Sequence, residues 1–174
     1  MKKKILISSG GSGGHVIPAI SFYDHLKKNF DITLLLDKRG TNFVNKKNYD
    51  YKILQSPRLT LNILKLPFTF FQFIISFFKS FFLLKNNNID ILLGTGGYMS
   101  VPICLAAKFL NIKIYLFEPN IVIGRANKFL VKFCNRIFCY SNKIINFPEE
   151  HANKILVIDN ILRKEIYNFK NIYK

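Results

Sequence analysis

Ser9-Gly10-Gly11-Ser12-Gly13-Gly14-His15 follows directly after the apolar run Ile5-Leu6-Ile7 and precedes an amphipathic stretch that begins at Val16. Four glycines between a strand and a helix let the backbone approach a ligand closely, and they direct amide N–H groups at it. His15 adds, at the first turn of the helix, the one side chain type that titrates near neutral pH. The segment predicts a strand–loop–helix unit that holds a polar ligand, phosphorylated or sugar-like, over a parallel sheet.

Apolar runs alternate with helical patterns along the rest of the chain. Strands are expected at 4–8, 32–36, 51–54, 89–94, 113–117, 136–139 and 155–158. Helices are expected at 16–28, 67–85, 101–110 and 123–133. This alternation indicates βαβ units, so we expect an α/β fold: a Rossmann-like parallel sheet with helices on both faces.

Polar and glycine-rich motifs follow several of the expected strands. In chain order they are the first glycine loop, Gly94-Thr95-Gly96-Gly97-Tyr98-Met99-Ser100, Glu118-Pro119-Asn120 and Asp159-Asn160-Ile161-Leu162-Arg163. In a parallel α/β sheet, ligands bind beyond the carboxyl ends of the strands. We therefore expect the loops that carry His15, Gly97, Asn120 and Arg163 to converge on one pocket.

The first glycine loop does not match two common nucleotide-binding motifs. Val16 stands where the dinucleotide fingerprint has its third glycine, and the Lys-Ser/Thr pair of a P-loop is missing. No cofactor is expected, and no metal either, because no carboxylate motif for a divalent metal is apparent. The alternative interpretation of the loop is a plain strand–helix turn. His15 is either a packing residue or a general base that takes a proton from an attacking hydroxyl.

The chain carries a formal net charge of +16. This charge favours an anionic partner such as a membrane surface, or it reflects the codon bias of a low-GC genome, because the lysines are scattered. Nucleic-acid binding is disfavoured because no recognised motif appears. Cys104, Cys134 and Cys139 lack paired spacing and are expected to be reduced, mostly buried thiols of a cytoplasmic protein. The apolar run behind the basic start is too short for a secretion signal.

A phenylalanine-rich segment at 67–84 is borderline in length for a bilayer span, which needs about 20 apolar residues. Its polar positions recur at steps of three and four, which places them on one stripe of an amphipathic helix. These positions are Thr69, Gln72, Ser76, Lys79 and Ser80.

The wide apolar arc of this helix has two possible uses: packing in the core, or peripheral contact with a membrane interface. Basic residues at Arg58, Lys65 and Lys85 flank the segment and favour the membrane. The expected membrane contacts are Phe70, Phe71, Phe78, Phe81 and Phe82.

Four motifs in order resemble the MurG family of glycosyltransferases, which belongs to glycosyltransferase family 28. They are Gly10-Gly11-Ser12-Gly13-Gly14-His15-Val16-Ile17-Pro18-Ala19, Gly96-Gly97-Tyr98-Met99-Ser100-Val101-Pro102, Glu118-Pro119-Asn120 and Asn127-Lys128-Phe129-Leu130. The resemblance implies one half of a GT-B fold: an amino-terminal, acceptor-side Rossmann-like domain over 1–165 and a tail over 166–174, without the carboxy-terminal donor domain. The family transfers N-acetylglucosamine from UDP-N-acetylglucosamine to an undecaprenyl-linked MurNAc-pentapeptide in peptidoglycan synthesis, and so serves cell shape and division.

The same resemblance implies roles for individual residues. His15 corresponds to the candidate base for the acceptor hydroxyl. The residues implied to bind substrate are Ser12, Gly13, Gly14, Gly97, Tyr98, Ser100, Glu118, Asn120 and Arg163. Without a donor domain we expect negligible transfer by the chain alone, on the cytoplasmic face of the inner membrane, unless a separately encoded carboxy-terminal half joins it. The alternative is a non-catalytic, membrane-docked subunit that recruits a separate catalytic half.

Overall fold

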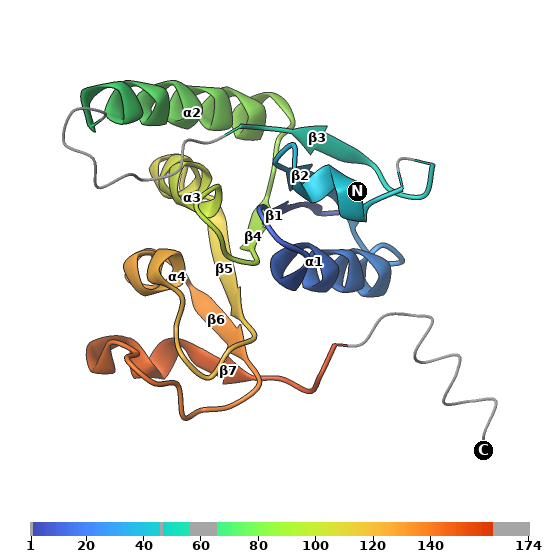
Figure 1. Cartoon of the computed structure of the whole chain (residues 1–174). Helices are drawn as coiled ribbons and strands as arrows, with labels where there is room; N and C mark the ends of the chain where they lie inside the picture. The colour runs from blue at the N-terminus through green and yellow to red at the C-terminus, as the bar shows by residue number, and fades with distance from the viewer. Residues whose placement is uncertain (1, 46, 56–65, 162–174) are drawn as a thin grey trace, which may run out of the picture.

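Seven parallel strands form the sheet at the centre of the molecule (Figure 1). The computed structural model describes residues 2–45, 47–55 and 66–161. The strands are β1 (Lys4–Ser9), β2 (Asp31–Leu36), β3 (Tyr51–Ile53), β4 (Ile91–Gly94), β5 (Lys113–Glu118), β6 (Arg136–Cys139) and β7 (Ile155–Val157). Their spatial order is β3-β2-β1-β4-β5-β6-β7. All seven strands expected from the sequence are present, with ends that differ by two residues at most.

The four expected helices are also present. They are α1 (Gly13–Leu26), α2 (Leu66–Asn86), α3 (Ser100–Phe109) and α4 (Arg125–Leu130). α1 begins three residues earlier than expected, because Gly13 and Gly14 already form its first turn and Ser12 is its N-cap residue. Among the described residues, the 3-10 helices η1 (Gly40–Phe43) and η3 (Glu149–Lys154) were not predicted.

Helices cover both faces of the sheet, as expected for a Rossmann-like domain. Side chains along β1 alternate between two cores. Ile5 and Ile7 pack in the core that includes Phe22 of α1. Leu6 points to the other face, where the core includes Ile103 of α3 and residues of α2 and α4. The predicted α/β fold with helices on both faces is therefore confirmed.

The strand order reverses between β1 and β4. The chain leaves β1 to build β2 and β3 on one side, and later returns to build β4 to β7 on the other. β1 and β4 pair directly, from Ile5 opposite Ile91 to Ser8 opposite Gly94. Loops at such a switch point diverge and leave a crevice at the carboxyl ends of the strands. Both glycine-rich loops emerge here.

Helix α2 turns its polar stripe inward, which reverses the arrangement expected of an amphipathic helix. Thr69, Ser76 and Ser80 are buried, although Lys79 is exposed. The Ser80 hydroxyl donates to the Ser76 carbonyl oxygen over 2.7 Å, so that hydroxyl is satisfied within its own helix. Short side chains at these positions let α2 lie close along α3, a contact that bulky residues would prevent (Figure 1).

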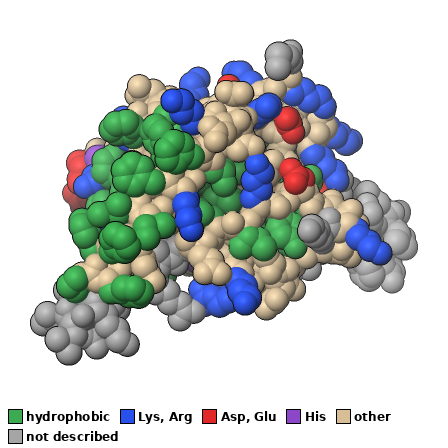
Figure 2. All heavy atoms as spheres, turned by 90° about the horizontal axis from the view of Figure 1, so that it is seen from above, with side chains coloured by type: hydrophobic (Ala, Val, Ile, Leu, Met, Phe, Trp, Pro, Cys, Tyr) green, Lys and Arg blue, Asp and Glu red, His purple; other side chains and the backbone are tan. Residues whose placement is uncertain are grey.

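The outer face of α2 is built from phenylalanines. The more exposed large side chains of this face are Phe68, Phe70, Phe71, Phe78 and Phe82, each more than half exposed. Figure 2 shows hydrophobic side chains gathered on this side of the molecule, with Lys and Arg among and around them. Phe81 differs from the other four expected membrane contacts: it is half-buried, packs against the core and meets Phe109 edge-on. Arg58 and Lys65 lie outside the described residues.

Candidate functional site

His15 lies where the two glycine-rich loops meet. Its Nδ1 atom is 2.8 Å from the carbonyl oxygen of Thr95. A carbonyl oxygen only accepts, so we assign a proton to Nδ1, and in the neutral ring Nε2 then carries the lone pair. The Thr95 hydroxyl in turn donates to the His15 carbonyl oxygen over 3.0 Å. Thr95 therefore holds both the ring and the backbone of the histidine.

Gly96 and Gly97 leave the space in which the imidazole lies. Both adopt positive φ angles, +98° and +85°. A Cβ on Gly96 would lie 2.9 Å from Cε1 and Nδ1 of His15. A Cβ on Gly97 would lie 3.0 Å from the Gly10 carbonyl oxygen. The second glycine pair is therefore needed for the ring position and for the close approach of the two loops.

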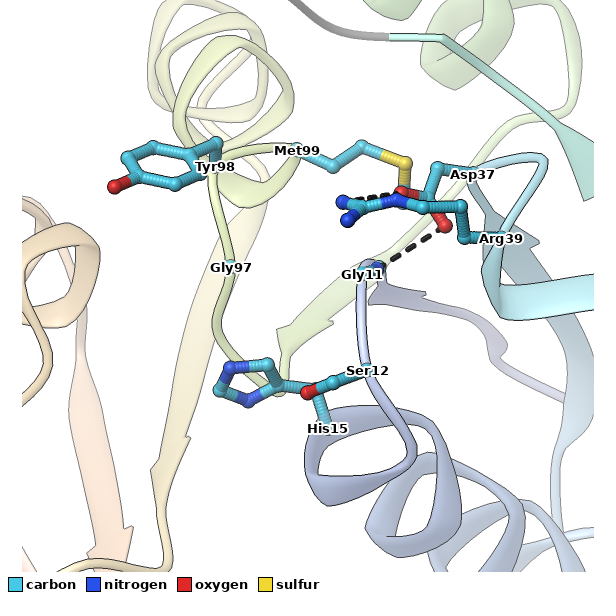
Figure 3. Close-up of a pocket in the computed structure, with 9 residues that line it drawn as sticks. Gly11, Ser12, His15, Asp37, Arg39, Gly97, Tyr98 and Met99 are labelled. Carbon is cyan, nitrogen blue, oxygen red and sulfur yellow. Dashed lines mark hydrogen bonds and ion pairs between the residues drawn. The ribbon is translucent and has the colours of Figure 1, made fainter. Parts of the chain in front are cut away.

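A first cavity of about 210 Å³ lies between the first glycine loop and the segment after β2. Its walls include Gly11, Ser12 and His15 on one side and Tyr98 on another (Figure 3). Asp37 and Arg39 also line it, although no sequence motif singled them out. They follow the carboxyl end of β2, the strand beside β1, so their place in the sheet order would have been the signal.

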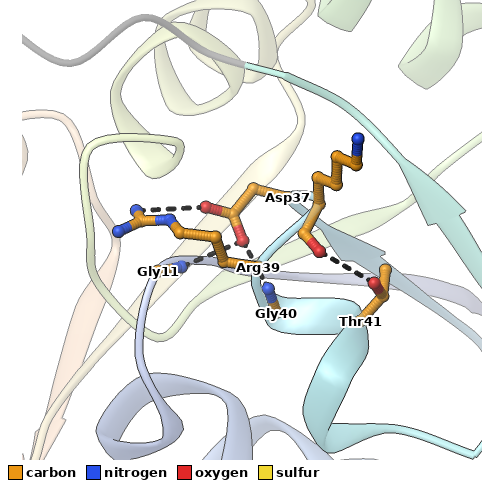
Figure 4. Close-up of polar contacts among 6 residues, drawn as sticks. Gly11, Asp37, Arg39, Gly40 and Thr41 are labelled. Atoms are coloured by element: carbon orange, nitrogen blue, oxygen red, sulfur yellow. Dashed lines mark hydrogen bonds and ion pairs between the residues drawn. The ribbon is translucent and has the colours of Figure 1, made fainter.

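The carboxylate of Asp37 joins the first glycine loop to the segment after β2 (Figure 4). Its Oδ1 accepts the N–H groups of Gly11 and Gly40, and its Oδ2 is 3.3 Å from Nη2 of Arg39. Partial burial opposes ionisation of the carboxyl, but the two N–H groups and the guanidinium outweigh it. The pKa of Asp37 is consequently lowered from its usual value of 3.8.

A second cavity of about 250 Å³ lies on the β5 side of His15. It shares His15, Gly97 and Tyr98 with the first cavity, so the imidazole borders both. Its other walls come from the loop after β5 and the start of α4, including Asn120 and Arg125. The two cavities thus form two lobes of one site, with the possible base between them.

Glu118 organises the wall of this second cavity. It is buried, and its carboxylate accepts hydrogen bonds from the backbone and side chain of Asn120, from the Gly124 N–H and from the side chain of Asn127. These four contacts take up most of the acceptor capacity of a carboxylate. The geometry therefore gives Glu118 the task of holding the loop in shape beside the cavity.

The structure brings together most of the residues predicted for the site. Residues that line one or both cavities are His15, Ser12, Gly97, Tyr98, Glu118 and Asn120. Gly13 and Gly14 line neither cavity. Ser100 is a correction: it is fully buried, and its hydroxyl donates to the Gly96 carbonyl oxygen over 2.9 Å instead of facing the cleft. Arg163 lies outside the described residues.

Comparison with known proteins gives a consistent family. Residues 5–139 match the model of the glycosyltransferase family 28 N-terminal domain. The UDP-N-acetylglucosamine--N-acetylmuramyl-(pentapeptide) pyrophosphoryl-undecaprenol N-acetylglucosamine transferase of Pelagibacter ubique is 52% identical over 174 residues, which are 100% of this chain and 49% of that protein. The transferase of the same name from Rickettsia canadensis is 32% identical over 172 residues, 98% of this chain and 48% of that protein. The chain spans about half the length of the curated relatives it matches.

Solved structures also resemble this chain over about half of their own length. Acinetobacter baumannii MurG superposes with a TM-score of 0.76 at 23% identity, over 95% of this chain and 48% of that one. The UDP-GlcNAc 2-epimerase of Neisseria meningitidis, bound to UDP-GlcNAc, gives a TM-score of 0.65 at 13% identity, over 98% of this chain and 50% of that one. These likenesses show the fold, which is that of one half of a GT-B protein. Since the family match covers most of its length, the chain belongs to glycosyltransferase family 28, through the amino-terminal domain of that family.

Proposed function

We propose that this chain supplies the acceptor-side half of a transferase that moves N-acetylglucosamine from UDP-N-acetylglucosamine to an undecaprenyl-linked N-acetylmuramyl-pentapeptide. Membership of family 28 and the names of the relatives support this reaction. The observation that carries the proposal is the His15 imidazole, whose Nδ1 contacts Thr95 and whose ring borders both cavities. Its Nε2 lone pair is thus available to a hydroxyl group bound between the two lobes.

The proposed step is an inverting sugar transfer. The acceptor hydroxyl oxygen attacks the anomeric carbon as its proton passes to Nε2 of His15, and the bond from that carbon to the diphosphate oxygen breaks, releasing UDP. The Thr95 carbonyl oxygen, 2.8 Å from Nδ1, orients the ring and stabilises the imidazolium that forms. Negative charge on phosphate oxygens is favourable near the N-terminus of α1, because its first N–H groups have no partner within the helix.

We further propose that turnover requires a carboxy-terminal half, on the same polypeptide or on a separate one. The relatives are about twice as long as this chain. The two cavities, of about 210 and 250 Å³, are also each smaller than the roughly 300 Å³ at which small-molecule sites begin. Each lobe therefore suits one portion of a substrate, and a facing domain would complete the enclosure.

The test combines this chain with the carboxy-terminal half of the Pelagibacter ubique relative and follows transfer of radiolabelled N-acetylglucosamine to a short-chain acceptor analogue. We expect H15A to lower kcat by roughly 10²- to 10⁴-fold, the usual contribution of a general base. H151Q, on η3, removes a histidine that lines neither cavity and is the matched control. Equal turnover by H15A and the parent would exclude His15 as the base.

We also propose that the phenylalanine face of α2 docks on the anionic cytoplasmic leaflet of the inner membrane, which makes the protein peripheral. By length and composition α2 could cross a bilayer. Its inner stripe is nevertheless buried against the domain, so the helix would lie along the interface while its outer phenylalanines enter it. Exposed Lys79 and Lys85 would each add about 1 kcal/mol near an anionic surface.

Sedimentation with phosphatidylglycerol-containing vesicles tests this docking. We expect binding at low salt, weaker binding at high salt, and a large loss in the F70S/F71S double variant, whose two side chains are 65% and 61% exposed. V157S is the control, because Val157 is 54% exposed on β7, away from α2. Equal vesicle binding by F70S/F71S and V157S would exclude the phenylalanine face as the contact.

A further inference from the structure

The first cavity carries a feature that the proposed base does not use. Arg39 lies in its wall, close to Gly11 of the glycine loop, and is paired with Asp37. We propose that Arg39 is a diphosphate-binding residue, and that the cavity beside Gly11 takes the diphosphate group of a substrate. This inference rests on the proposed function, since both substrates of that reaction carry a diphosphate.

Asp37 fixes where the arginine side chain lies. Its Oδ1 accepts the Gly11 N–H over 3.1 Å and the Gly40 N–H over 2.7 Å, and this joins the segment after β2 to the glycine loop. Its Oδ2 receives Nη2 of Arg39 over 3.3 Å. The carboxylate charge is therefore already balanced by a guanidinium and two N–H dipoles. An incoming anion would meet the arginine beside a carboxylate whose charge is already balanced.

The guanidinium lies over the glycine loop itself. A Cβ on Gly11 would be 3.3 Å from Nη2 of Arg39, and Gly11 has a φ of +91°. Figure 3 shows the guanidinium extending across Gly11 toward the side of the cavity formed by Gly97 and Tyr98. The absence of a side chain at Gly11 thus leaves room for the guanidinium beside the glycine loop.

Most of the donor capacity of Arg39 is still available. A guanidinium has five N–H donors, and among the described residues its ion-pair partner is Asp37, through Nη2. The side chain is 52% exposed, so a ligand in the cavity can reach the other donors. A planar fork of N–H groups matches phosphate oxygens in pairs, which a lysine ammonium does not. The volume of about 210 Å³ suits a diphosphate better than a whole nucleotide sugar.

Binding of inorganic pyrophosphate to this chain, measured by calorimetry at low ionic strength, tests the assignment. We expect R39Q to bind about tenfold to hundredfold more weakly, the usual effect of losing a charge-assisted hydrogen bond to an anion. R39K should be intermediate, because it keeps the charge and loses the fork. K38Q removes a neighbouring positive charge outside the cavity wall and should stay within about twofold of the parent.

Two further titrations distinguish whether the diphosphate belongs to the lipid-linked acceptor or to the sugar nucleotide. A short-chain prenyl-diphosphate acceptor analogue and UDP-N-acetylglucosamine are each titrated into the parent chain and into R39Q. Weakening for the acceptor analogue assigns the cavity to the lipid-linked substrate, and weakening for the sugar nucleotide assigns it to the donor. Equal loss of pyrophosphate binding in R39Q and K38Q, or no binding by the parent, overturns the assignment.

These results can be told apart from failure of the proposed function. Binding of pyrophosphate through Arg39, together with no transfer in the reconstituted assay, would refute the reaction and keep the phosphate site. Transfer that depends on His15, with an R39Q variant that keeps the parent KM for both substrates, would support the reaction and refute the phosphate site. Thermal unfolding of each variant is recorded alongside, and R39K serves where R39Q folds poorly.

Discussion

Replacing Gly96 by alanine tests how His15 is held. The φ of +98° at this position is one that L side chains rarely adopt, at a cost of about 1 to 3 kcal/mol. The added Cβ would also lie 2.9 Å from two ring atoms of His15, and overpacking of this kind costs about 1 to 3 kcal/mol. If the ring stays in place, the free energy of unfolding should fall by about 2 to 6 kcal/mol. If the ring moves, it gives up its contact with Thr95.

Urea unfolding and ¹⁵N NMR of the imidazole distinguish these two outcomes. We expect G96A either to unfold at lower urea concentration or to lose the Nδ1–H tautomer of the parent, and in both cases to lower transfer in the reconstituted assay. G14A is the control for stability, because its Cβ would meet Ser12 Oγ at 3.7 Å, an ordinary contact, and alanine favours a helix by up to about 1 kcal/mol. A G96A variant with the stability and the tautomer of the parent would refute this account of the second glycine loop.

Three further predictions concern buried or ionised groups. E118Q should lower the free energy of unfolding by roughly 1.5 to 3 kcal/mol, because an amide cannot accept all the hydrogen bonds that the carboxylate accepts; the exposed E150Q should change it by less than about 0.5 kcal/mol in the same urea titration. Since the folded pKa of Asp37 is depressed, its stabilisation should be complete well above 3.8 and lost as the pH falls through the folded value, so the stability gap between the parent and D37N should close in acid. Burial raises the pKa of Cys134 to about 11, against a smaller opposing effect of a nearby lysine, and burial raises the pKa of Cys139 to about 12. At pH 8 the native protein should therefore react with a thiol reagent far more slowly than the unfolded protein. Equal reaction rates would contradict this.

Much of the fold could be predicted from the sequence because apolar runs and glycine loops report local structure directly. The run Ile5-Leu6-Ile7 and the glycines after it specify a strand, a loop and a helix without reference to any other part of the chain. Helix α4 was less predictable. Its expected span began at Ile123, but that N–H donates to the Ile145 carbonyl oxygen, a contact between segments distant in sequence that delays the helix to Arg125.

Site residues that belong to a sequence motif could be predicted. Site residues that are recognised only by the position of their strand in the sheet could not. Thr95 stands between two glycines and reads as part of a turn, yet its carbonyl oxygen sets the tautomer of His15. Asp37 and Arg39 look like an ordinary charged turn until β2 is known to lie beside β1. The orientation of α2 could not be predicted either, because a stripe of hydroxyl residues is compatible with close packing against a helix as well as with exposure to solvent.

The direct pairing of β1 with β4 has a consequence for how such an enzyme would work. The hydrogen bonding continues past the end of β4, where the Thr95 N–H donates to the carbonyl oxygen of Ser8 in β1 over 3.0 Å. The two loops that contact the imidazole therefore cannot separate unless the hydrogen bonds between the central strands β1 and β4 break. In the proposed transferase this part of the molecule would therefore move as a rigid unit, and a hinge that admits substrates or releases products would lie elsewhere.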